Sequence, residues 1–188
     1  MAEFPCTPGQ TVGPFFAVGL AGDGDLVTRT HPRAVRLHGT VYDGAGRGVP
    51  DALVELWQPD GAGNVPRRSG SLRRDAAAFT GWGRSGTDAA GRYGFTTVAP
   101  GSAVDGRPPF FALTVFARGL LNRLFTRAYL PDGDLDTDPA LAALSTLDAA
   151  RRSGLLCTAD TDGAAYRFDI HLQGPKETVF LAYRDDGR

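Results

Sequence analysis

The sequence contains only two cysteines, Cys6 and Cys157, which lie far apart along its 188 residues. They have no CxxC spacing, so the cysteines give no support to a metal site. The N-terminal residues lack the basic stretch followed by an apolar one that marks a signal peptide. We therefore expect both cysteines to be free thiols in a reducing cytoplasm.

Long apolar runs and an excess of one charge are also missing. No run approaches the ~18 residues that a membrane-spanning helix requires. The chain has 20 Lys and Arg residues against 21 Asp and Glu, a formal net charge of −1, which argues against nucleic acid or an anionic membrane as a partner. The 42% of hydrophobic and 22% of charged residues are typical of one soluble globular domain.

Catalytic signatures are absent as well. The sequence has no GxSxG elbow, no HExxH motif, no Walker loop and no dinucleotide fingerprint. The three histidines, His31, His38 and His171, each favour a surface or strand-edge position over a catalytic one. The residues alone therefore predict no self-contained active site.

The chain does contain a repeated alternation of short apolar runs and turn residues. Its 25 glycines and 13 prolines are spread between those runs, as in a domain of short strands and many turns. Residues 1–34 lack any period and predict an extended arm that packs on its own body or on another chain. Expected strands occupy 35–42, 52–57, 92–98, 110–117, 123–130, 165–173 and 177–183, and a loop region reaches from Asp60 to about residue 90. One helix is expected between a cap at Thr137 or Asp138 and a stop at Gly154.

These elements predict an all-β fold, an antiparallel β-sandwich with an extended N-terminal arm and one short helix. The arm would comprise residues 1–34, and a single sandwich domain residues 35–188.

Several segments, in order and at matched spacing, give the chain a family resemblance. They are Thr7-Pro8-x-Gln10-Thr11-Val12-Gly13-Pro14-Phe15, Gly39-x-Val41-Tyr42-Asp43-Gly44, Val54-Glu55-Leu56-Trp57-Gln58, Asp88-x-x-Gly91-x-Tyr93, Pro100-Gly101, Phe116-Ala117-Arg118-Gly119-Leu120, Thr126-Arg127-x-Tyr129 and Ala165-Tyr166-Arg167-Phe168-Asp169-Ile170. Over nearly its full length the chain resembles the intradiol ring-cleaving dioxygenases, and within them the α subunits of the two-chain enzymes that cleave protocatechuate.

The resemblance implies a non-heme Fe(III) site whose ligands this chain lacks. Catalytic chains of the family hold the iron with two tyrosines and two histidines. The corresponding positions here are Val65, Ala103, Phe110 and Ala112, and none of these side chains has a donor for a hard ferric ion. The metal is therefore expected in a homologous iron-binding β subunit, and none in this chain.

By the same resemblance, this chain would help to build the substrate pocket over the iron of its partner. Thr11, Gly13, Pro14 and Phe15 of the arm would line that pocket, together with Arg127. An arginine and backbone donors would suit a small aromatic substrate that carries a carboxylate. The resemblance implies a cytoplasmic assembly of several α–β protomers that inserts both atoms of O₂ into protocatechuate and yields 3-carboxy-cis,cis-muconate.

Two alternatives remain open at this stage. A non-catalytic β-sandwich binding module would be an autonomous monomer with no need of the arm. An intradiol enzyme for another catechol would require iron ligands of its own if it acted alone, or could be a two-chain enzyme with a different substrate.

Overall fold

The computed structural model describes residues 24–67, 79–142, 149–160 and 163–182, with the single residues Gly13, Leu20 and Gly22. In order along the chain, the elements are β1 (Ala34–Tyr42), β2 (Leu53–Trp57), β3 (Trp82–Gly86), β4 (Arg92–Val98), β5 (Phe110–Phe116), β6 (Leu124–Tyr129), the 3₁₀ turn η1 (Leu135–Thr137), α2 (Pro139–Ala142), α3 (Ala149–Ser153), β7 (Thr158–Ala159), β8 (Ala165–Arg167) and β9 (Ile170–His171).

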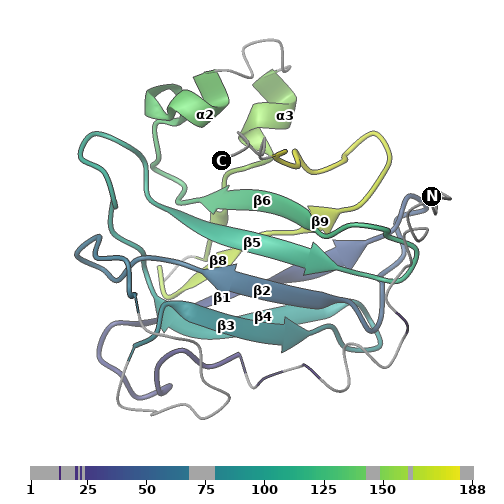
Figure 1. Cartoon of the computed structure of the whole chain (residues 1–188), viewed down its shortest axis with the longest axis horizontal. Helices are drawn as coiled ribbons and strands as arrows, with labels where there is room; N and C mark the ends of the chain where they lie inside the picture. The colour runs from purple at the N-terminus through teal and green to yellow at the C-terminus, as the bar shows by residue number, and fades with distance from the viewer. Residues whose placement is uncertain are drawn as a thin grey trace, which may run out of the picture.

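The strands form two sheets that pack face to face (Figure 1). One sheet has the order β4-β1-β8-β7, with β9 also paired to β1, and the other has the order β3-β2-β5-β6. The short helices lie beyond the β6 edge of the second sheet (Figure 1). The predicted all-β sandwich is confirmed.

Two strand pairs differ from a purely antiparallel arrangement. Both β8 and β9 run parallel to β1, whereas β1–β4, β2–β3, β2–β5, β5–β6 and β7–β8 are antiparallel. A parallel partner needs a long crossover connection. The helical segment after β6 belongs to that connection, because it carries the chain from the second sheet back to the first.

The apolar pattern located most strands to within one or two residues. The strand predicted over 165–173 is instead two short strands, β8 and β9, and the prediction missed both β7 and β3. Strand β3 lies inside the region predicted as a loop because its two inward positions are Gly83 and Ser85, both buried, so that no apolar period marks it. The predicted last strand is also wrong over the described residues 177–182, where Leu181 forms a lone bridge with Phe125. The predicted helix is represented by η1, α2 and α3, and residues 143–148 between them lie outside the described residues.

The core between the sheets is made by alternate residues of the central strands. Leu37 and Val41 of one sheet, and Leu56, Phe111 and Leu113 of the other, are 0–1% exposed. A second apolar cluster joins Tyr129 to Leu141 of α2 and to Leu155 after α3. This second cluster fixes the helical segment on the end of β6.

Three turns repeat one local design. In each, an aspartate carboxylate accepts the backbone N–H groups two and four residues ahead; the aspartates are Asp43, Asp60 and Asp88. The residue three positions after each aspartate is a glycine with a positive φ of 75–86°, which other residues adopt only with strain. These turns close the loops that follow β1, β2 and β3.

Residues before β1 already contact the sandwich. Leu26 and Val27 are 5% and 8% exposed, and the Leu26 N–H donates to the carbonyl of Thr96. Most of the predicted arm, residues 1–34, lies outside the described residues, so the proposed division of the chain at residue 34 stays a prediction. No helix of the described residues has the length and apolar character needed to cross a membrane.

Candidate functional site

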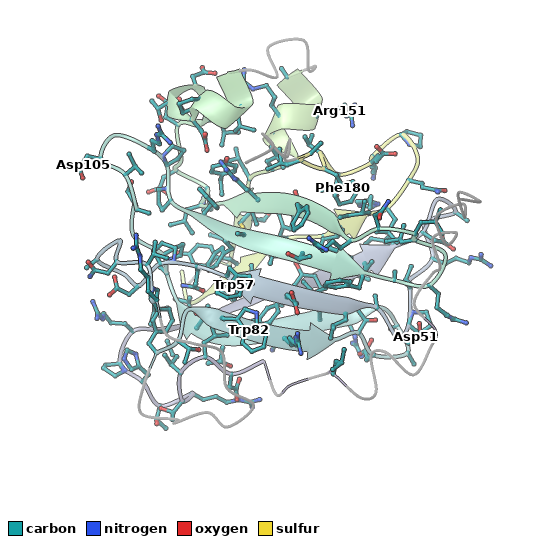
Figure 2. All side chains as sticks on the ribbon, viewed as in Figure 1. Asp51, Trp57, Trp82, Asp105, Arg151 and Phe180 are labelled. Atoms are coloured by element: carbon teal, nitrogen blue, oxygen red, sulfur yellow. The ribbon has the colours of Figure 1, made fainter. Side chains whose placement is uncertain are left out.

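Two loops that carry predicted ligand positions touch each other at one end of the four-stranded sheet. The Gly101 N–H donates to the carbonyl of Asp60 at 2.8 Å. A Cβ atom at Gly63 would overlap the carbonyl oxygen of Ser102, so the two backbones are in close contact. The loop with Ala103 therefore lies against the loop with Val65. The loop with Ala103 has its tip at Asp105, which projects from the end of the sandwich (Figure 2).

The other two ligand positions lie on β5, beside β6. Phe110 pairs with Tyr129 and Ala112 with Arg127 across the antiparallel ladder. Residues two apart on a strand share a face, so Phe110 and Ala112 point to the same side of the sheet.

A cavity of about 130 Å³ lies at this end of the molecule. Its lining includes Ala103 and Phe110 together with three charged residues, namely Arg107, which is exposed, Arg127 and Asp138. Val65 lies outside it, with 57% of its surface exposed. The rest of the lining comes from the two loops, namely Pro59, Gly101, Ser102, Val104, Pro108 and Pro109.

Arg127 and Asp138 form a nearly buried ion pair in this cavity. Nη1 of Arg127 donates to Oδ2 of Asp138 at 2.7 Å, and the side chains are 17% and 3% exposed. The Tyr129 hydroxyl donates to the same Oδ2 at 2.6 Å. The Arg127 guanidinium also stacks over the Phe110 ring, 4.3 Å from its centre. Burial raises the pKa of Tyr129, and the bond to Asp138 raises it further, so this hydroxyl stays protonated and donates at neutral pH.

An aromatic patch marks the outer side of the same sheet. Trp57 is 51% exposed, and the centre of its ring lies 5.9 Å from the centre of the Trp82 ring on the neighbouring strand. Both side chains lie on the face turned to the viewer in Figure 2. Arg84 stacks on Trp82 at 4.8 Å and bonds Glu55 at 2.7 Å. Exposed aromatic surface of this kind is typical of a contact with another protein.

The predicted pocket residues are placed only in part. Thr11, Pro14 and Phe15 lie outside the described residues, and Gly13 is exposed. Arg127 lies in the cavity of its own chain, in contact with Asp138. Its predicted role toward a partner's substrate is not tested by this contact and stays a prediction.

Asp138 is the site residue that sequence reasoning missed. Its position before Pro139 predicted a helix cap, and its carbonyl does accept the N–H of Leu141. Its side chain, however, is turned inward toward Arg127. No local pattern distinguishes a capping aspartate from a buried counter-ion, because the partner is set by the fold and not by nearby residues.

Comparison with known proteins places the chain in a family. A family model described as Dioxygenase matches residues 13–174. The chain is 38% identical over 198 aligned positions to the protocatechuate 3,4-dioxygenase alpha chain of Burkholderia cepacia, covering 96% of this chain and 99% of the relative. The chain belongs to the intradiol dioxygenase family. A second alpha chain, from Pseudomonas putida, is 34% identical over 95% of this chain and 97% of its own length.

The family also includes a relative of the other chain type. The protocatechuate 3,4-dioxygenase beta chain of Burkholderia cepacia is 36% identical over 74% of this chain and 64% of its own length. Among solved structures, the dioxygenase domain of a carbohydrate-binding fusion from Streptomyces sp. SirexAA-E is 26% identical, with a TM-score of 0.58 over 89% of this chain and 98% of that one. Catechol 1,2-dioxygenase from Acinetobacter sp. ADP1 shares the fold, with 21% identity and a TM-score of 0.55 over 80% of this chain and 58% of that one.

The residues at this site do not fit the non-heme iron that the family generally uses. The four predicted ligand positions hold valine, alanine, phenylalanine and alanine, which offer a ferric ion no oxygen or nitrogen ligand. Among the described residues, no group of three or more His, Cys, Asp or Glu side chains could hold a metal ion. We therefore derive no chemical step through iron bound to this chain.

Proposed function

We propose that this chain is the non-iron α subunit of a cytoplasmic protocatechuate 3,4-dioxygenase. The observation that carries the proposal is end-to-end similarity to alpha chains combined with the loss of donors at Val65, Ala103, Phe110 and Ala112. A scaffold of this family without metal ligands needs a second chain that supplies the iron. The similarity to a beta chain supports a homologous partner of that kind.

In the proposed enzyme, Fe(III) is held by the partner, and this chain contributes pocket wall and assembly. Its arm residues Thr11, Gly13, Pro14 and Phe15 would line the substrate side of the partner's site, and Arg127 would assist in holding the substrate carboxylate. The net reaction adds both atoms of O₂ to protocatechuate and breaks the bond between its two hydroxylated carbons, giving 3-carboxy-cis,cis-muconate. Orientation of the substrate is the contribution expected of a chain without a reactive group.

Surface features are consistent with an obligate partner. The exposed Trp57 and its neighbour Trp82 form an aromatic surface on the outer side of the second sheet. A stable interface with a homologous chain would cover such a surface. Several α–β protomers would form the complete assembly.

Co-expression with candidate iron-bearing homologous chains tests the proposal. We expect the two chains to co-purify, the complex to contain one iron for each pair of chains, and protocatechuate to be cleaved with equimolar consumption of O₂. A soluble, stable monomer that co-purifies with none of these chains would instead favour the binding-module alternative. An active complex that prefers another catechol would retain the subunit role and correct the substrate.

A further inference from the structure

The guanidinium of Arg127 places a positive charge in the cavity beside Phe110. Arg127 lies opposite Ala112 on the neighbouring strand, and its guanidinium stacks on Phe110. Both neighbours occupy positions where the family resemblance places metal ligands. The positive charge of Arg127 is thus next to two of those four positions.

The same cavity contains a carboxylate that needs a cation. Asp138 is 3% exposed at its side chain, and a carboxylate removed from water to that degree is costly unless it is paired and hydrogen-bonded. Nη1 of Arg127 supplies the charge at 2.7 Å, and the Tyr129 hydroxyl supplies a hydrogen bond at 2.6 Å.

We infer that the Arg127 guanidinium is the resident cation of this degenerate metal site, with Asp138 as its fixed counter-ion. The donor set that would hold a ferric ion is missing, and a covalently attached cation takes its place. This inference does not rest on the proposed function, because it concerns contacts within one chain.

The pair also joins two parts of the fold. Arg127 belongs to β6, and Asp138 stands between η1 and α2. Beside the pair, Tyr129 contacts Leu141 and Leu155 in the second apolar cluster. The ion pair therefore holds the helical segment on the sheet in the place where a metal centre would otherwise join the surrounding loops.

Removal and chemical replacement of the guanidinium test this inference in the full chain. We expect Arg127→Ala to lower the melting temperature by about 10 °C, since it removes the cation that lies 2.7 Å from a buried carboxylate. Ethylguanidinium, at constant ionic strength, should raise the melting temperature of this variant in a saturable manner. Ethylguanidinium should not raise the melting temperature of the native chain. Nor should it raise that of Arg92→Ala, which removes an exposed pair with Asp88 of similar length, 2.8 Å.

A second pair of variants decides the question even if Arg127→Ala folds poorly. Asp138→Asn retains an acceptor for Tyr129 and removes the negative charge. It should destabilise the native chain, where it removes the counter-ion 2.7 Å from the guanidinium, and stabilise Arg127→Met, where it removes a buried carboxylate that has lost this cation. If Asp138→Asn changes the melting temperature in the same direction in the native chain and in Arg127→Met, the inference is wrong. It is also wrong if ethylguanidinium still raises the melting temperature of the double variant Arg127→Ala/Asp138→Asn.

Discussion

Gly39 and Phe168 lie so close together that a side chain at position 39 has no room. A Cβ atom there would overlap the carbonyl oxygen of Phe168 and lie 3.1 Å from the ring of Tyr93. The Tyr93 hydroxyl crosses this gap and donates to that same carbonyl oxygen at 2.6 Å. The absence of a side chain at Gly39 thus lets the segment between β8 and β9 close on β1.

We expect Gly39→Ala to lower the free energy of unfolding by about 3 kcal/mol, because the backbone must move to relieve the overlap. Gly94→Ala is the matched control, on the partner strand β4, since its Cβ would meet nothing closer than 3.6 Å. That change should stay within about 1 kcal/mol of native stability. Urea denaturation measures both, and equal effects of the two substitutions would contradict the packing argument.

This contact also shows how far the sequence could predict the fold. Gly39, Tyr93 and Phe168 come from three separate family segments whose order was visible, yet only the fold brings them to one point. The alternation of apolar residues identified β1 and β4 because their inward positions carry large apolar side chains, and a run that is apolar on both faces identified β5. Neither pattern could identify β3, whose inward residues are glycine and serine.

The candidate site was predictable only in what it lacks. The resemblance predicts that the four ligand positions are substituted, because those positions follow recognisable segments, and this assignment stays a prediction. The Arg127–Asp138 pair could not be predicted, because its members are separated by a loop and meet through the packing of α2 on β6. In the sequence, Arg127 resembles an ordinary arginine of a strand, and Asp138 resembles an ordinary helix cap.

The aspartate turns predict loss of stability in acid. Hydrogen bonds from the Asn64 side chain and backbone lower the pKa of Asp60 below its ordinary value of 3.8. The backbone N–H groups of Arg47 and Arg92 do the same for Asp43 and Asp88. A folded-state pKa below the unfolded one stabilises the fold above pH 3.8, and that contribution disappears as the pH falls through the lowered value.

Urea denaturation between pH 6 and pH 2.5 measures this dependence. The Asp60→Asn variant should lose part of the decline below about pH 4, because an amide does not titrate there. Asp105→Asn, at the exposed tip of the neighbouring loop, should retain the full decline. A pH profile of Asp60→Asn that superimposes on the native profile would show that the turn contributes nothing through its charge.

The purified full chain should carry no stoichiometric iron and show no visible tyrosinate-to-iron absorption. The four positions implied by the resemblance have no donor atoms in their side chains, and a ferric ion requires hard oxygen or nitrogen ligands. Metal analysis and absorption spectra of the chain, alone and in complex with an iron-bearing partner, make the comparison. Tightly bound iron in the single chain would disprove the assignment of these four positions.

The last prediction separates a substrate role of Arg127 from its structural one. If Arg127 also helps to hold the substrate carboxylate, Arg127→Ala should lower kcat/KM of the assembled enzyme about ten- to a hundredfold, as expected for a charge-assisted hydrogen bond of about 1.5–3 kcal/mol. Arg127→Lys should recover part of the lost kcat/KM, since lysine restores the charge without the planar fork of donors.

Iron content and subunit ratio must be equal in every sample, because an assembly defect would imitate weaker substrate binding. Asp138→Asn provides the comparison, since it breaks the ion pair at 2.7 Å and leaves the guanidinium in place. A loss of kcat/KM in Arg127→Ala that exceeds the loss in Asp138→Asn would support direct contact with substrate. Unchanged kinetics in an iron-loaded Arg127→Ala complex would confine Arg127 to the ion pair with Asp138.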